Sequence, residues 1–194
     1  FKVNFYCPDY FNTPNLCPKC PFEKVGNEFV NWISLNTFAK KKILVGYSLG
    51  GRLALHIFEK NPDLFQNLIL ISTNPGLSNE DEKVHRAIND KNWAESFTHS
   101  PWAEVIEKWN QQPVFEGSFF EPEREDTHYR RDLLGKALTN WSLAKQEDKR
   151  SVIKNNQAKI IWIVGDKDKK YIEITKNLYK EASDVHYLIL PEAG

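Results

Sequence analysis

Gly46-Tyr47-Ser48-Leu49-Gly50 is the stretch of sequence that decides the fold. Residues 42–45 before it are apolar and β-branched, which predicts a short buried strand. Residues 52–59 after it place apolar side chains on one face, which predicts a helix. A serine at a sharp turn from strand to helix is held in a strained backbone conformation that exposes its hydroxyl. We therefore expect Ser48 to be a reactive serine, with glycines two residues before and after it because side chains there would clash.

This strand–turn–helix context is the nucleophile elbow of an α/β-hydrolase. At such an elbow, the backbone N–H of the residue after the serine faces the same space as the hydroxyl. Leu49 is therefore expected to supply half of an oxyanion hole. The alternative is a chance glycine–serine turn, which would not explain the flanking strand and helix.

Strand-like and helix-like segments alternate along the chain, which predicts a mainly parallel sheet with right-handed crossovers. Roughly eighty residues without a strand signal separate the third expected strand from the fourth, and they read as helices. We expect one domain of α/β-hydrolase fold, with a helical cap inserted after the third strand. Both ends look cut from a larger domain, because strand-like segments stand almost at Phe1 and just before Gly194. The expected core is 1–77 and 147–194, and the expected cap is 78–146. Strands are expected at about 2–7, 42–45, 68–71, 160–164 and 187–190. Helices of the core are expected at about 22–38, 52–59 and 170–182.

The composition excludes several classes of partner. Lysines and arginines number 26 and so do aspartates and glutamates, so the net charge is zero. This argues against binding to nucleic acid or to an anionic membrane surface. No apolar run approaches the length of a membrane span. Cys17 and Cys20 form a C-x-x-C, but no second cysteine or histidine pair has metal-ligand spacing, so we expect no metal and ordinary thiols of a cytoplasmic protein.

A triad acid is expected after the strand at residues 160–164. Asp166 and Asp168 follow that strand, and acids at the carboxyl end of a parallel strand lie at the catalytic edge of the sheet. We expect Asp168 to be the triad acid because it lies deeper in the loop, with Asp166 as the second candidate. The alternative for both is a solvated turn.

The triad histidine belongs after the last strand, where this chain has none. We therefore expect the catalytic histidine just beyond Gly194 and the other oxyanion donor before Phe1. On this expectation residues 1–194 alone are inert, because a serine hydroxyl needs an imidazole to take its proton. The chain's five histidines are His56, His85, His99, His128 and His186.

Arginines suggest an anionic substrate. Arg52 stands one turn beyond Ser48, and Arg86 and Arg130 lie in the expected cap. Guanidinium groups bind carboxylates bidentately, although a solvated surface charge is the alternative for each. Tyr47 and Trp109 are candidates for the apolar walls of a pocket, with an ordinary core position as their alternative.

Several segments resemble the 2-succinyl-6-hydroxy-2,4-cyclohexadiene-1-carboxylate synthases, which are menaquinone-pathway lyases of the α/β-hydrolase superfamily. The resemblance covers about residues 43–120, and it is looser at 142–146 and 165–168. One segment, residues 7–12, departs from the family's usual Asp-Leu-Pro-Gly-His-Gly. The matching segments are 44–52, Asn74-Pro75-Gly76-Leu77, Asn92-Trp93-Ala94 with Phe97, and the run from Trp109 to Phe115.

The resemblance implies an elimination, in which pyruvate leaves an enolpyruvyl-bearing cyclohexene carboxylate and the activated serine acts as a base. It implies no cofactor, and a small polycarboxylate as the partner. By position, the triad residues would be Ser48 and Asp168, and the pocket residues would be Tyr47, Arg52, Arg86, Trp109 and Arg130.

Two other functions stay open. A serine esterase or carbon–carbon bond hydrolase of the same fold would use Ser48 as a nucleophile. A non-catalytic binding protein of this fold would explain the missing histidine.

Overall fold

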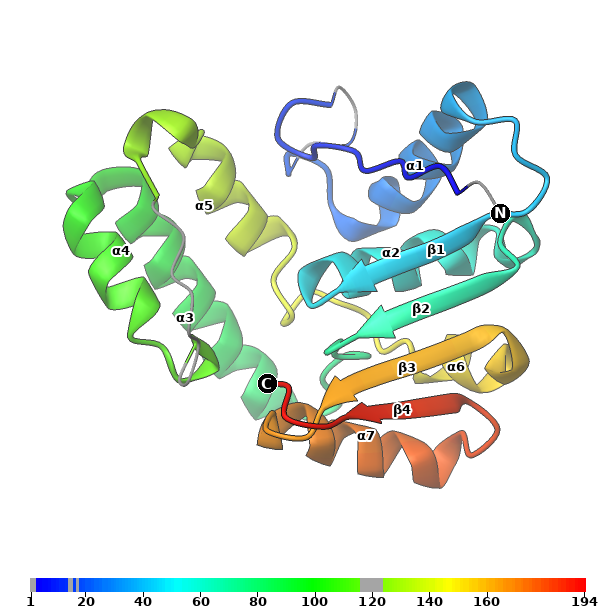
Figure 1. The fold of residues 1–194 in the computed structure, drawn as a ribbon. Coiled ribbons are helices and arrows are strands. Elements are labelled where there is room, and N and C mark those ends of the chain that lie inside the picture. Colours follow the sequence, from blue (N-terminus) through cyan, green and yellow to red (C-terminus); the bar gives the residue numbers. More distant parts are fainter. Residues whose placement is uncertain (1–2, 14–15, 17, 116–123) are drawn as a thin grey trace.

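A parallel sheet forms the centre of the structure. The computed structural model describes residues 3–13, 16, 18–115 and 124–194. In this part of the chain, four parallel strands follow one another in the order β1-β2-β3-β4, so their carboxyl ends meet at one edge (Figure 1). The strands are β1 (Ile43–Tyr47), β2 (Asn67–Ile71), β3 (Ile160–Gly165) and β4 (His186–Leu190).

Helices cover one face of this sheet. α2 (Leu49–Lys60) packs against β1 and β2, and α1 (Phe22–Asn36) packs against α2. α6 (Arg150–Asn155) precedes β3, and α7 (Lys169–Glu181) joins β3 to β4. Short 3₁₀ turns lie at Pro62–Leu64, Pro113–Phe115, Asp126–His128 and Gln157–Lys159.

The core lies between the sheet and these helices. Leu68 and Leu70 of β2, Trp162 of β3, and Leu55 and Phe58 of α2 are buried there. Burial of each such apolar side chain contributes about 1.5–3 kcal/mol, so α2 is held firmly on the strands. The position of the turn between β1 and α2 therefore follows from core packing.

The strand expected at 42–45 forms as β1, but it is buried on one face only and not on both. Leu44 and Gly46 face inward, while Ile43, Val45 and Tyr47 are exposed. The pattern arises because side chains alternate along a strand and α2 covers only one side of β1. Figure 1 shows α2 and α6 behind the sheet.

The strand expected at about residues 2–7 does not form over the described residues 3–7. These residues have no strand assignment, and Val3 and Phe5 are exposed. A strand is stable only beside a neighbour that takes up its backbone hydrogen bonds, and none of the described strands pairs with this segment. The helical insertion therefore follows the second strand of the structure.

Among the described residues, three of the four helices between β2 and β3 in chain order lie beside the carboxyl edge of the sheet (Figure 1). They are α3 (Glu80–His99), α4 (Trp102–Asn110) and α5 (Arg131–Asn140), and they fall inside the segment expected to form the cap. Asn79 caps α3 by accepting hydrogen bonds from the N–H groups of Asp81 and Glu82, as Asn at this position favours. Pro101 precedes α4 as its cap residue. No helix of the described residues is long and apolar enough to cross a membrane.

Candidate functional site

Ser48 stands at a strained turn where β1 ends and α2 begins. Its φ of 48° and ψ of −114° are costly for a residue with a side chain. The Ser48 N–H donates to the Ile71 carbonyl at 2.9 Å, which ties the turn to the end of β2. Leu49 opens α2, so its N–H has no carbonyl one turn earlier to bond. The geometry is that of an elbow that can present the Ser48 hydroxyl and the Leu49 N–H.

The glycines around this turn differ in what they permit. A Cβ on Gly46 would lie 2.5 Å from the Gly50 carbonyl oxygen and 2.5 Å from the Gly51 Cα. A Cβ on Gly51 would overlap the Thr73 hydroxyl, whereas a Cβ on Gly50 would meet nothing within 4 Å. A side chain would therefore clash at Gly46, as expected, but not at Gly50. The second position at which a side chain would clash is Gly51.

Asp168 follows β3 and caps α7, where its side chain accepts a hydrogen bond from the Tyr171 N–H at 3.1 Å. Burial raises the pKa of the Tyr171 phenol, and a hydrogen bond with the Ser48 side chain opposes that rise. The Tyr171 phenol thus lies near the Ser48 side chain, while the Tyr171 backbone contacts Asp168. Asp166 is exposed, and its backbone N–H donates to Leu190. Sequence reasoning missed Tyr171, although its place in the first turn of a helix at this sheet edge was a usable signal.

Among the described residues no histidine hydrogen-bonds to Ser48. His56 is 1% exposed and stacks on Phe22 at 4.5 Å. His186 begins β4, at the opposite end of that strand from the carboxyl edge. His128 pairs with Glu125 at 3.6 Å, and His85 and His99 are exposed on α3.

A cavity of about 230 Å³ lies between the elbow helix and the three inserted helices. Leu49 and Arg52 form its side toward the elbow, while Ser48 itself is not part of the lining. Its other walls are mainly apolar. The aromatic lining residues are Phe11, Phe97, Trp102, Trp109, Tyr129 and Trp141.

Positive charge concentrates in this cavity. Arg52, Arg86 and Arg124 line it, and Asp90 is the acid that accompanies them. Burial, and next the charge of Arg86, lowers the pKa of Arg52 to about 10, so Arg52 stays cationic at neutral pH. One Arg52 Nη donates to the Trp141 carbonyl at 2.8 Å. An apolar cavity with this surplus of guanidinium groups attracts anionic ligands.

The structure brings Arg52, Arg86 and Trp109 to the cavity but not Tyr47 or Arg130. Tyr47 is 67% exposed because alternation along β1 points it away from α2. The side chain of Arg130 is 53% exposed and lies 4.0 Å from Asp132. Arg124, which sequence reasoning missed, takes a place in the lining, and its Nη1 donates to the Asn110 side chain at 2.6 Å.

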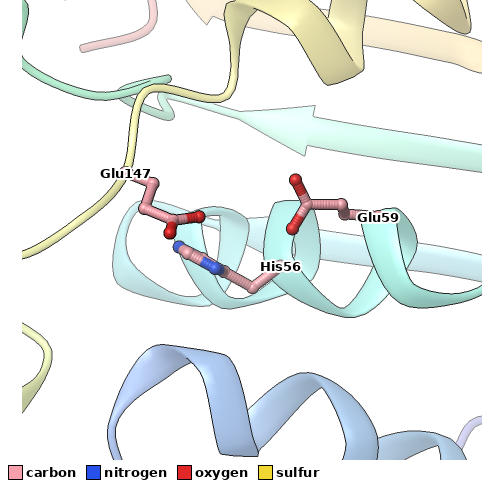
Figure 2. Close-up of side chains that lie close together, drawn as sticks. All are labelled: His56, Glu59 and Glu147. Atoms are coloured by element: carbon pink, nitrogen blue, oxygen red, sulfur yellow. The ribbon is translucent and has the colours of Figure 1, made fainter.

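One cluster among the described residues has the ligand types of a metal site. Ligand atoms of His56, Glu59 and Glu147 lie within 4.8 Å of one another (Figure 2). The Lys149 ammonium, whose side chain is 1% exposed, donates to Glu59 at 2.8 Å and to Glu147 at 2.6 Å. An internal cation thus already pairs with both carboxylates, and the cluster joins α2 to the chain that returns from the inserted helices. Cys20 is half-buried, and Cys17 lies outside the described residues.

His56 should make the protein sensitive to acid. Burial, followed by the charge of Lys149, lowers its pKa from 6.5 to about 3. Because the folded pKa is depressed, the unfolded state takes up the proton first, so stability is lost as the pH falls from 6.5 toward 3. From pH 7 to pH 4, the free energy of unfolding should fall by about 2–3 kcal/mol less in His56→Leu than in the parent. Urea denaturation at both pH values measures this, with exposed His186→Gln as the control; equal falls in parent and His56→Leu would contradict it.

Residues 20–100 match the family model described as alpha/beta hydrolase fold. Curated proteins named 2-succinyl-6-hydroxy-2,4-cyclohexadiene-1-carboxylate synthase are similar to this chain. The one from Enterobacter sp. (strain 638) is 34% identical over 156 residues, which is 78% of this chain and 58% of that protein. The one from Escherichia coli O1:K1 / APEC is 32% identical over 155 residues, with 78% and 60% covered. The chain thus spans less than two thirds of the length of these relatives.

Solved structures show the same architecture. MenH from S. aureus aligns with a TM-score of 0.79 at 20% identity, over 90% of this chain and 68% of that one. A thermophilic esterase from Thermogutta terrifontis aligns with a TM-score of 0.62 at 18% identity, over 90% and 65%. The chain therefore has the α/β-hydrolase fold, and its resemblance to the 2-succinyl-6-hydroxy-2,4-cyclohexadiene-1-carboxylate synthases is confirmed by curated relatives of that name.

Proposed function

We propose that this protein is a cytoplasmic lyase that eliminates pyruvate from an enolpyruvyl cyclohexene carboxylate in menaquinone biosynthesis. The observation that supports this best is the cavity beside the elbow. Arg52, Arg86 and Arg124 suit the carboxylates of such a substrate, and the aromatic walls suit its ring. The names of the curated relatives support the same reaction.

In the proposed reaction, Ser48 acts as the base. Its hydroxyl, activated by an imidazole, takes a proton from a ring carbon, and the electron pair of that C–H bond becomes a new ring double bond. The C–O bond to the enolpyruvyl group breaks, and the released enolpyruvate takes up a proton to become pyruvate. Asp168 orients the imidazole, and the Leu49 N–H stabilises negative charge that develops in the transition state. No described histidine stands beside Ser48, so every activity experiment uses the complete gene product.

Arg52 and Arg86 should each bind a substrate carboxylate. Changing either to alanine removes charge-assisted hydrogen bonds inside a largely apolar cavity, so each should cost about 2–4 kcal/mol in transition-state binding. Steady-state kinetics on the enolpyruvyl substrate gives kcat/KM for both variants, and thermal melts confirm that they are folded. A loss of less than about twofold in both would show that neither arginine contacts the substrate. The same kinetics on Arg124→Ala and Arg130→Ala test which of these two arginines binds the substrate. We expect the loss in kcat/KM for Arg124→Ala.

A serine esterase or carbon–carbon bond hydrolase is the second candidate, because a strained elbow serine also serves as a nucleophile. Product analysis by NMR separates the two, with the enolpyruvyl substrate in one reaction and a generic aryl ester in the other. We expect pyruvate from the first and little cleavage of the second. A non-catalytic binding protein of this fold, the third candidate, would turn over neither compound.

A further inference from the structure

Asp90 and Arg86 form an unusual ion pair in the wall of the cavity. The Arg86 Nε donates to both carboxylate oxygens of Asp90, at 2.9 and 2.8 Å. The Asp90 side chain is only 4% exposed, and both residues line the cavity. Among the hydrogen bonds of the described residues, neither Nη of Arg86 is used. The hydrogen bonds to Asp90 thus use only the Nε of the guanidinium and leave its two Nη groups available.

The spacing of this pair is that of an ordinary helix pair, but its surroundings differ. Lys91 and Glu95 on the same helix also stand four residues apart. The Lys91 Nζ lies 3.8 Å from the Glu95 Oε1, however, and the Glu95 side chain is 61% exposed. Such an exposed pair contributes only about 0.3–0.5 kcal/mol to stability. Burial of a carboxylate costs far more than that unless it is paired, so helix stability alone does not account for Asp90.

The repulsion between the charges of Arg52 and Arg86 indicates why Asp90 lies in the cavity wall. Arg52 and Arg86 are close enough that the charge of Arg86 lowers the pKa of Arg52, after burial, while Asp90 opposes this effect. The Arg86 side chain is 33% exposed, so without an anchor the repulsion from Arg52 would favour conformations turned into water. Asp90 holds the guanidinium in the wall against this repulsion.

We propose that Asp90 is a positioning residue, whose buried carboxylate fixes Arg86 so that its Nη groups meet a carboxylate of the ligand in the cavity. This inference rests on the proposed function only in requiring an anionic ligand. If only net charge mattered, removal of the Asp90 carboxylate would tighten the binding of an anion. The proposal predicts weaker binding, because Arg86 loses its anchor.

A double-mutant cycle in the complete gene product tests whether Asp90 acts through Arg86. Arg86→Ala and Asp90→Ala should each lower kcat/KM for pyruvate release roughly tenfold or more. The double variant should match Arg86→Ala within about twofold, because Asp90 has no role once its arginine is gone. Glu95→Ala, on the same helix, is the control and should stay within about twofold of the parent. Multiplying effects in the double variant, or an unchanged or raised kcat/KM in Asp90→Ala, would overturn the proposal.

Binding without turnover separates this proposal from the proposed function. Phthalate serves as a cyclic dicarboxylate probe, with its affinity measured by calorimetry for the same variants. We expect Asp90→Ala to bind phthalate at least roughly fivefold more weakly than the parent. Asp90→Ala should also lose the slowly exchanging Arg86 Nε–H signal in NMR spectra. Asp90→Asn, which keeps one acceptor oxygen at this place but no charge, is the second variant should Asp90→Ala fail to fold, and it should also bind phthalate more weakly than the parent, by a smaller factor than Asp90→Ala.

Tighter phthalate binding by the Asp90 variants, or no binding by the parent, would overturn the positioning role. A different result would reject the lyase function alone. In that case the parent binds phthalate, the Asp90 variants bind it more weakly, and the parent releases no pyruvate. Asp90 would then remain the anchor of Arg86.

Discussion

Ser48→Ala should lower kcat/KM for pyruvate release by about 10³–10⁶-fold, because the members of a serine triad act as a unit. The variant should unfold at the same temperature as the parent. The φ of 48° stays equally strained for alanine, and the hydrogen bond from the residue 48 N–H to Ile71 is kept. Steady-state kinetics on the enolpyruvyl substrate and a thermal melt give both quantities in the complete gene product.

The control for this variant is Ser34→Ala. Ser34 lies on α1, where its hydroxyl only donates to the Val30 carbonyl within the helix. Its loss should leave kcat/KM within about twofold. Retention of most of the activity by Ser48→Ala, with Ser34→Ala equally active, would mean that the elbow hydroxyl is not the reacting group.

Gly46→Ala should lower the free energy of unfolding by about 3–5 kcal/mol. A methyl group at this position would lie 2.5–2.6 Å from atoms of Gly50 and Gly51. These neighbours are backbone atoms of the first turn of α2, which the core holds in place, so the clash cannot be relieved by a side-chain rotation. We expect the turn between β1 and α2 to give way, and activity to fall with it.

Gly50→Ala is the matched variant from the same motif. A methyl group there meets nothing within 4 Å, and alanine is the better helix former. Its free energy of unfolding should therefore stay within about 1 kcal/mol of the parent. Urea denaturation of the two variants side by side measures the difference. Equal destabilisation would show that the packing around Gly46 is not what fixes the elbow.

The sequence allowed the elements that surround the elbow to be predicted with good accuracy. The expected strands near residues 44, 69, 162 and 188 all form, although the side chains of β4 are largely exposed. The helices on either side of the elbow also form, as does the one that follows Asp168. Each of these elements carries its own periodic signal, and the α/β-hydrolase fold follows from their order.

Other features depend on neighbours that a local pattern does not reveal. Residues 3–7 alternate like a strand but lack a paired neighbour in the described sheet, and Tyr47 faces away from the cavity because only one side of β1 is covered. Arg124 and Arg130 precede the same helix, and nothing in their spacing indicates which one reaches the cavity. The closeness of Tyr171 to Ser48 and the burial of the Asp90 carboxylate in the cavity wall arise only in the folded chain.

The proposed elimination is tested most directly by following pyruvate and the conjugated ring product together, in one reaction of the complete gene product with the enolpyruvyl substrate. Elimination removes a ring proton as the C–O bond breaks, so each pyruvate must appear with one cyclohexadiene. We expect the two products to accumulate in equal amounts from the first time point. Pyruvate without the diene would mean that water cleaves the enolpyruvyl ether, and would contradict the lyase mechanism.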